Sequence, residues 1–289
     1  MQSTLHINAY SLRFLAVFAL VFSMWSCEDV IEVDTPSEDP RLIVDALIRV
    51  DTTTAFTNVR IQVSQTNGFF ESIPPVDLQQ ITLTGLEGGL SAILLETSPG
   101  VYEQDISTPA LSSGEEIFLQ IDFENEFYVA YATYVPAPQI DELKQGDGFL
   151  FDEDDTEVIV RFTDIPEEEN FYVFDFGFGN FLASEDTFYE DQEFVFSYFY
   201  DDEVETGDEL TISILGADAP FYNYMNQLVE QSEDDLNPFQ TPTLTVRGNL
   251  INATEIDNDE FFDNVEMENN FALGYFAIVQ EHKASLTIE

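Results

Sequence analysis

Ile117-Phe118-Leu119-Gln120-Ile121 alternates aliphatic residues with residues suited to the opposite face, and this is the clearest β signal in the chain. A period of two residues is typical of a strand with one buried face. Six further β runs lie between residues 41 and 135, separated by clusters of Gly, Pro and Ser. They are 42–50, 59–64, 80–84, 90–96, 100–105 and 127–135. This spacing predicts an Ig-like β-sandwich over residues 41–136, without the cysteine pair of immunoglobulin domains.

A second β domain is predicted over residues 137–289, after the proline-containing junction that ends the first. Its expected strands are 139–143, 157–163, 170–178, 193–200, 209–215, 243–251, 271–279 and 283–288. Asp218 and Pro220 predict the start of one helix near 219–233, because Asp can cap a helix and Pro suits its first turn. Its apolar stripe, expected to pack against a sheet, consists of Phe221, Tyr224, Met225 and Leu228. The whole chain is therefore predicted to be mostly β, with an antiparallel sandwich or barrel in this second part.

Residues 1–26 have the features of a bacterial lipoprotein signal peptide. The apolar run at 14–22 has the length of a signal-peptide core and is too short to span a bilayer. Directly after it, Ser26 precedes Cys27, the only cysteine of the chain. We expect Cys27 to become the lipidated first residue, followed by a polar tether over 27–40 that anchors the protein to a membrane. A secreted protein with one chance cysteine is the alternative.

The charge of the mature chain excludes one class of partner. Without residues 1–26, which hold one arginine and no acid, 57 acidic residues face 7 basic ones, a formal charge of −50. Binding to nucleic acid needs clustered Lys and Arg, so nucleic acid is excluded as a partner. Because 44% of the residues are hydrophobic, including 27 Phe and 12 Tyr, the chain can still fold around a core.

Few residues are available for catalysis. After lipidation of Cys27 the mature chain has one histidine, His282, and no thiol, so a Cys–His pair and a His-rich zinc site are excluded. His282 is expected at the surface. A pair of carboxylates of the glycosidase type stays possible, which leaves a carboxylate-dependent hydrolase as an alternative. We expect no enzyme, no catalytic residue and no cofactor.

Runs of acidic residues fall between the expected strands. Calcium binds six to eight oxygen atoms, often supplied by such loops, and Asp152, Asp154 and Asp155 are the weak candidates for a calcium site. None of the runs has the spacing of an EF-hand. Solvated loops are the alternative.

Several short segments together resemble a large family of Bacteroidota outer-membrane lipoproteins, catalogued as domain of unknown function 4249. The segments are Cys27–Ile31, Arg41–Ala46, Gly100–Tyr102, Tyr134–Ile140, Tyr222–Gln231, Val246–Asn249 and Ala272–Phe276. The resemblance implies an outer-membrane lipoprotein, exposed at the cell surface. It also implies a non-catalytic accessory or binding role beside a TonB-dependent transporter in nutrient uptake, and it supplies no catalytic residues. A structural or adhesive envelope lipoprotein is the alternative.

We predict that Cys27→Ala removes the membrane anchor, because the acyl chains that stabilise attachment have no other residue to modify. In detergent phase partitioning, the parent is expected in the detergent phase and Cys27→Ala in the aqueous phase. Ser26→Gly keeps a small residue before the cysteine and serves as the matched control. Equal recovery of Cys27→Ala and parent in the detergent phase would contradict lipidation.

Overall fold

A computed structural model describes residues 39–289, apart from 69–70, 150–154, 167–168, 201–203, 233–244, 259–261 and 265–269. The described chain is mostly β, as the sequence predicts. It contains three sheets and two α-helices, the short α2 (Thr108–Leu111) and the longer α3 (Ala219–Ser232). A short 3-10 helix, η1 (Asp186–Phe188), follows β13 (Phe181–Glu185). None of the three sheets closes on itself within these residues, so the sandwich form of the prediction applies to both halves.

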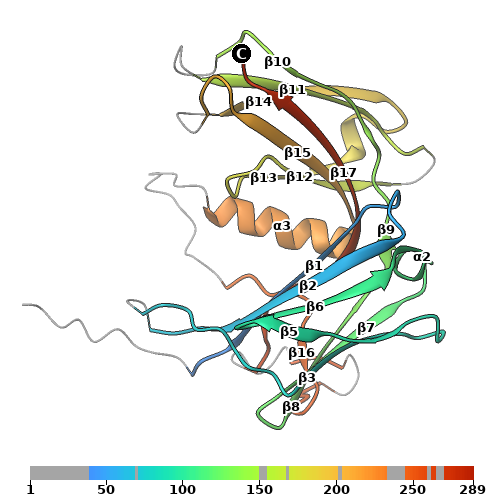
Figure 1. The fold of residues 1–289 in the computed structure, drawn as a ribbon, viewed down its shortest axis with the longest axis vertical. Helices are drawn as coiled ribbons and strands as arrows, with labels where there is room; N and C mark the ends of the chain where they lie inside the picture. The colour runs from blue at the N-terminus through green and yellow to red at the C-terminus, as the bar shows by residue number, and fades with distance from the viewer. Residues whose placement is uncertain are drawn as a thin grey trace, which may run out of the picture. The chain divides into compact units, whose positions relative to one another are not determined.

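The largest sheet has nine strands and contains segments from both ends of the described chain (Figure 1). Its order is β13 (Phe181–Glu185), β12 (Phe171–Asp175), β15 (Glu209–Ala217), β17 (Leu273–Thr287), β1 (Leu42–Val50), β2 (Phe56–Gln65), β6 (Val101–Ser107) and β5 (Leu95–Ser98). The short strand β9 (Tyr134–Val135) also pairs with β17. The pairing of β17 with β1 is parallel, whereas its pairing with β15 is antiparallel.

A first core lies between one half of this sheet and a five-stranded sheet. The five-stranded sheet has the order β16 (Ile251–Asn252), β8 (Glu126–Ala132), β7 (Ile117–Phe123), β3 (Gln80–Gly85) and β4 (Ser91–Ile93). Ile117, Leu119 and Ile121 are fully buried, which confirms the alternation that predicts this strand. Residues from β17, such as Phe276 and Ile278, complete the same core.

A second core lies against the other half of the nine-stranded sheet. It is covered by a three-stranded sheet with the order β10 (Ile140–Gln145), β11 (Thr156–Thr163) and β14 (Glu193–Tyr200). Aromatic rings fill it, with Phe162 contacting Tyr172, Phe174 and Tyr189 at centroid distances of 5.4–5.7 Å. Edge-to-face contacts of this kind suit the electrostatics of aromatic rings.

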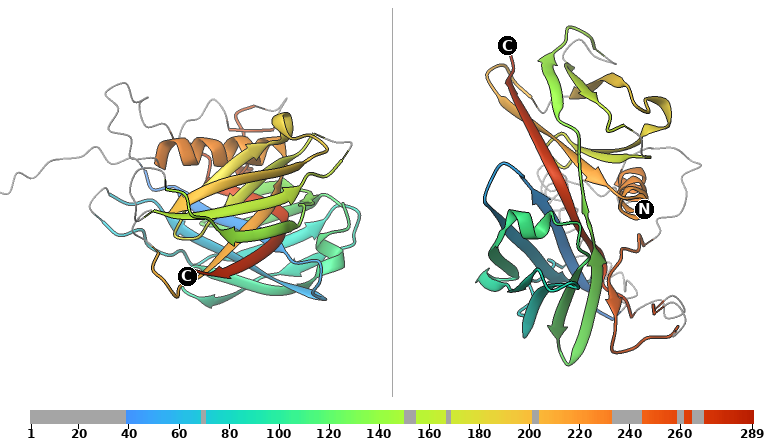
Figure 2. Two further views of the ribbon diagram at one scale, coloured as in Figure 1. Left: turned by 90° about the horizontal axis from the view of Figure 1, so that it is seen from above. Right: turned by 90° about the vertical axis from the view of Figure 1, so that its right-hand side faces the viewer.

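Helix α3 (Ala219–Ser232) packs on the face of the nine-stranded sheet opposite the second core (Figure 2). Asp218 caps its first turn, since the amide of Phe221 donates to Asp218 Oδ1 at 2.8 Å. Phe221 and Met225 are buried against β12, β15 and β17, as predicted. Helix α3 thereby depends on the same strand that completes the first core.

Strand β17 corrects the prediction of two closing strands at 271–279 and 283–288, because it is one continuous strand of 15 residues. Glu281, between the two predicted runs, is held in the strand by two cations and a hydroxyl group. Glu281, 7% exposed, accepts from Arg49 at 3.1 Å and Ser213 at 2.8 Å, and Lys283 Nζ lies 3.0 Å from its other oxygen. Arg49 also pairs with Asp175 at 2.7 Å, so the network links β1, β12, β15 and β17. The predicted division of the chain near residue 136 stays a prediction.

Four other strand predictions were wrong in their extent. The runs expected at 90–96 and 127–135 are each divided between two sheets, the first into β4 and β5 and the second into β8 and β9. The strand expected at 170–178 ends at Asp175, and residues 177–180 form a turn. The strand expected at 243–251 is reduced to the two residues of β16; residues 243 and 244 lie outside the described part. Residues 247–249 instead pack against the start of β17.

A close backbone contact fixes the start of β17. A Cβ atom at Gly248 would collide with the carbonyl oxygen of Gly274, and one at Gly274 would collide with that of Val44. Gly274 has φ of +98°, a conformation that side chains disfavour. Asn249 completes the contact, since its side chain accepts from the amide of Phe276 at 2.9 Å and donates to its carbonyl at 2.8 Å.

We predict that Gly248→Ala destabilises the fold by about 2 kcal/mol or more, because the added methyl group forces this tight contact apart. Urea unfolding of the mature chain measures the change in free energy. Gly68→Ala is the matched control, since a Cβ there meets the nearest atom at an ordinary 3.6 Å. Equal unfolding midpoints for the two variants would contradict the role assigned to this contact.

Candidate functional site

A groove with a volume of about 590 Å³ lies between helix α3 and the β12–β13 turn. Small-molecule pockets have volumes in this range. Its lining comes from three elements that are distant in sequence: the second half of α3, the turn with the start of β13, and β14. The lining includes Asn180, Phe181, Leu182, Tyr198, Leu228 and Ser232.

The helix wall arises because the apolar stripe of α3 is longer than the sheet beneath it. Phe221 and Met225 are buried, and Tyr224 packs on Tyr275 with a centroid distance of 4.8 Å. Leu228, one turn further on, is 37% exposed and faces the groove. The prediction that the stripe packs against a sheet is therefore confirmed for its first two turns, whereas Leu228 lines the site.

The opposite wall is a turn held in an unusual conformation. Gly177, Phe178 and Gly179 all have positive φ, at 79°, 53° and 85°. Hydrogen bonds from Phe176 N to Asn180 O (2.9 Å) and from Asn180 N to Gly177 O (2.8 Å) close the turn. For a residue with a large side chain, this backbone region costs about 1–2 kcal/mol.

Phe178 occupies that unfavourable conformation and nevertheless exposes its ring to solvent, with 62% of its surface accessible. Its ring lies 6.3 Å from that of Tyr200, so it stands beside the aromatic edge of β14. Backbone strain concentrates at functional sites, and its observation supports a hypothesis of function. Phe178 itself does not line the groove, whereas Gly179 and Asn180, the next two residues of the turn, do.

The base of this wall is rigid because aromatic rings stack behind it. Tyr198 stacks on Phe176 with a centroid distance of 3.8 Å and an angle of 6° between the rings. The hydroxyl of Tyr200 donates to the carbonyl of Phe176 at 2.7 Å, which ties β14 to the start of the turn. The position of Tyr198 in the groove is therefore fixed by packing before any ligand binds.

The lining of the groove contains no charged residue among those that the structure describes, although the chain carries 57 acids. Asn180 and Ser232 offer hydrogen bonds, and the rest of the lining is mainly aromatic or aliphatic. A bound ion in such a groove would lose its hydration without gaining a partner. The groove is therefore suited to an uncharged ligand with an apolar face.

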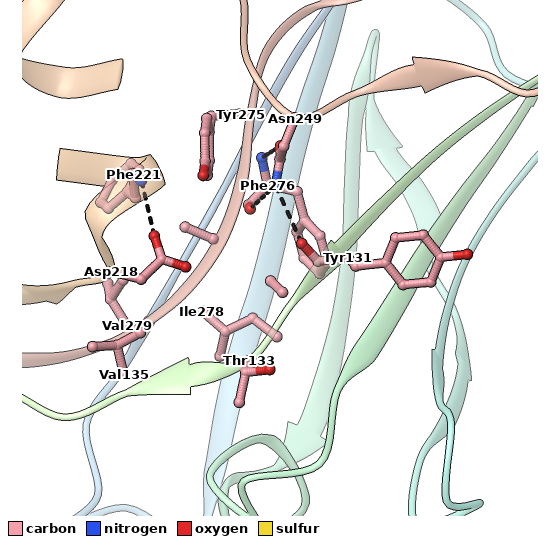
Figure 3. A pocket seen from close by; sticks show the side chains of 12 residues that line it. Tyr131, Thr133, Val135, Asp218, Phe221, Asn249, Tyr275, Phe276, Ile278 and Val279 are labelled. Atoms are coloured by element: carbon pink, nitrogen blue, oxygen red, sulfur yellow. Dashed lines mark hydrogen bonds between the residues drawn. The ribbon is translucent and has the colours of Figure 1, made fainter. Parts of the chain in front are cut away.

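A second, much smaller cavity lies at the first turn of α3 (Figure 3) and has a volume of about 20 Å³, enough for one water molecule. Asp218 and Asn249, two of its polar residues, hold backbone groups. Asp218 caps α3, and Asn249 bonds to Phe276 and to the carbonyl of Tyr131 at 3.2 Å. This cavity is part of the packing between α3 and β17 and offers no room for a substrate.

A hydrolase of the glycosidase type would require a pair of carboxylates in a cleft. The described buried acids are Glu115, Asp164, Asp186 and Glu281. Each accepts hydrogen bonds from its neighbours: backbone amides hold Glu115 and Asp186, and the hydroxyl of Tyr172 donates to Asp164 at 2.6 Å. None of the four lines the groove.

The tyrosines beside these acids are held in the neutral form. Burial raises the pKa of Tyr189 to about 12. Burial, together with the hydrogen bond to Asp164, raises the pKa of Tyr172 well above its usual value. Both phenols thus act as hydrogen-bonding core residues at neutral pH.

The predicted site residues fall mostly outside the described part of the chain. Cys27, Asp152 and Asp154 lie there, while Asp155 is described, half-buried and directly before β11. In the described ranges, no group of three or more His, Cys, Asp or Glu side chains could hold a metal ion. His282 is half-buried in β17, with its Nε2 2.9 Å from the side chain of Gln280.

The groove could not be predicted from the sequence. Its one local signal is a phenylalanine between two glycines, Gly177-Phe178-Gly179, because glycines favour turns and an aromatic residue at a turn is exposed. The other signal is Leu228 at the end of the helical stripe. Only the three-dimensional structure shows that this turn and the end of the helical stripe lie on the same groove.

No helix in the described ranges has the length and apolar character needed to span a bilayer. A search of curated proteins finds no match. The structural similarity of this chain to solved structures is weak, as the identities and TM-scores of three of them show.

A DUF4785 family protein from Legionella pneumophila has 10% sequence identity and a TM-score of 0.23, over 61% of this chain and 52% of that one. This chain thus spans about half the length of that protein. A DUF3823 family protein from Bacteroides ovatus has 10% identity and a TM-score of 0.22, over 62% and 91% of the two chains. The human OSCAR ligand-binding domain has 12% identity and a TM-score of 0.20, over 64% and 94%.

A family model matches far more of the sequence than any of these structures. It covers residues 28–284, which is nearly all of the chain after Cys27. The chain therefore belongs to the family described as Domain of unknown function (DUF4249).

Proposed function

We propose that this protein is a lipid-anchored, non-catalytic binding protein of the outer membrane, which captures an uncharged ligand in the groove beside α3. In this role it assists a TonB-dependent transporter in nutrient uptake, facing the cell surface. The observation that carries the binding role is the absence of charged residues from the described lining of the groove, in a chain of such high negative charge.

The groove supports binding because its parts are rigid before a ligand arrives. Tyr198 is stacked on Phe176, and the turn that presents Phe178 is closed by two backbone hydrogen bonds. Rigid aromatic side chains offer contact area at a low cost in conformational entropy. Neutral oligosaccharides fit this chemistry, since their rings have apolar faces and their hydroxyls can bond to Asn180 and Ser232.

The anchoring and the transporter partnership rest on the sequence. Cys27 follows a signal-peptide core directly, and the family resemblance implies a place beside TonB-dependent transporters. A binding protein held by a lipid stays close to a membrane transporter, which raises the effective concentration of its ligand at the transporter.

We predict that Leu228→Glu weakens ligand binding about tenfold or more, because a carboxylate would be desolvated in the apolar groove. The measurement is isothermal titration calorimetry of the mature chain with neutral hexasaccharides of glucose, xylose and mannose. Leu95→Glu is the matched control, since Leu95 is 63% exposed on β5, a strand that contributes no residue to the groove. If no hexasaccharide binds the parent, or if both variants bind as the parent does, the proposed ligand class is wrong.

We also predict that the full chain co-purifies with one barrel-type transporter from outer membranes solubilised in a mild detergent. The lipid anchor and the transporter would be held in the same membrane, so Cys27→Ala is expected to reduce recovery of the transporter. Mass spectrometry of tagged parent and Cys27→Ala preparations measures this. Recovery of no transporter, or turnover of a hexasaccharide that one buried Asp or Glu controls, would contradict the accessory role.

A further inference from the structure

Arg247 is held in an unusual setting for a cation of this acidic chain. Five of the other basic side chains form ion pairs: Arg49, Arg60, Lys144, Arg161 and Lys283. Arg247 instead lies over the ring of Phe271 at 4.7 Å from its centroid. No carboxylate among the described residues lies within ion-pair distance of its guanidinium.

The surroundings of Arg247 fix its position. Gly248, the next residue, is in close backbone contact with Gly274, and the side chain of Asn249 is bonded to both backbone groups of Phe276. Phe271 is 8% exposed, so the ring beneath the guanidinium is itself part of the core. A guanidinium stacked on a fixed ring loses little conformational freedom when it binds an anion.

A second guanidinium lies over the same ring. Arg41 is 5.3 Å from the centroid of Phe271, so the two guanidinium carbons are at most 10.0 Å apart. Phe271 thus packs against two cationic side chains, and its contact with Arg247 holds that guanidinium beside the cavity described next.

Arg247 lines an open cavity of about 510 Å³, distinct from the groove beside α3. Tyr131 contributes an aromatic surface to the lining, because it is 41% exposed and its ring points away from α3 (Figure 3). A contact with Phe118, at a centroid distance of 5.0 Å, holds that ring in place. Asp263, on the same lining, offers a carboxylate that can accept hydrogen bonds from hydroxyl groups.

We propose that this cavity binds a sugar acid, a hydroxylated ring that carries a carboxylate. The carboxylate pairs with the guanidinium of Arg247, where two parallel N–H···O bonds are possible. The face of the sugar ring packs on Tyr131, and its hydroxyls donate to Asp263. A neutral sugar would lack the ion pair with Arg247. A carboxylic acid without hydroxyl groups would lack the hydrogen bonds to Asp263 and would place two carboxylates near each other.

The test uses the full mature chain and trigalacturonate, with its methyl ester as the uncharged counterpart, in isothermal titration calorimetry at 0.15 M salt. Trigalacturonate is expected to bind the parent, and Arg247→Gln is expected to raise its dissociation constant about tenfold or more, as for a lost charge-assisted contact. Arg247→Lys keeps the charge without the fork of donors and should bind with intermediate affinity. Arg60→Gln, which makes the same change of charge on β2, is the matched control and should bind as the parent does.

Thermal melts of each variant separate a loss of binding from a loss of folding, since Arg247→Gln should melt close to the parent. Absence of trigalacturonate binding to the parent overturns the proposal. So does equal affinity for the methyl ester, or an equal effect of Arg247→Gln and Arg60→Gln. Because Leu228 lines a different hollow, Leu228→Glu should leave trigalacturonate binding unchanged.

Discussion

Strand β17 is the constraint on which the rest of the structure depends, because its two halves bond to different neighbours. Residues 273–280 pair in parallel with β1, and residues 281–287 pair in antiparallel fashion with β15. The first half completes one core, and the same strand supports α3 on its other face through Ala277 and Val279. The groove therefore keeps its shape only while β17 holds the helix and the β12–β13 hairpin on one sheet.

The segments that carry the family resemblance mostly build this frame. Arg41–Ala46 forms most of the strand that pairs with β17, and Tyr134 and Val135 pair with Ile278 and Val279. Val246–Asn249 and Ala272–Phe276 meet in the contact of Gly248 with Gly274. Their shared role in this chain is packing around β17.

Much of the fold could be predicted from the sequence, because local patterns determine most strands. The alternation at 117–121 and the cap at Asp218 both hold in the structure. The continuity of β17 could not be predicted, since Glu281 is a strand residue only because Arg49, Lys283 and Ser213 surround it. Arg49 lies 232 residues and Ser213 lies 68 residues from Glu281 along the chain, and only Lys283 is a near neighbour in sequence.

The candidate site could not be predicted from the sequence, for a related reason. An aromatic run such as 171–178 has the same pattern whether it continues as a strand or turns, and only the left-handed conformation at 177–179 distinguishes the two.

Two hollows of similar size differ in charge, and the ligands proposed for them differ accordingly. With 57 acids on the chain, long-range repulsion disfavours any anion, so recognition of one requires a cation that no internal carboxylate neutralises. Arg49 and Lys283 cannot serve, because Glu281 and Asp175 engage them to keep β17 continuous. Arg247 stays outside such pairs in the described part of the chain because an aromatic ring holds it. The ring of Phe271 holds this guanidinium outside an ion pair, whereas the described lining of the groove has no charged residue, so the recognition proposed there is by shape and apolar contact.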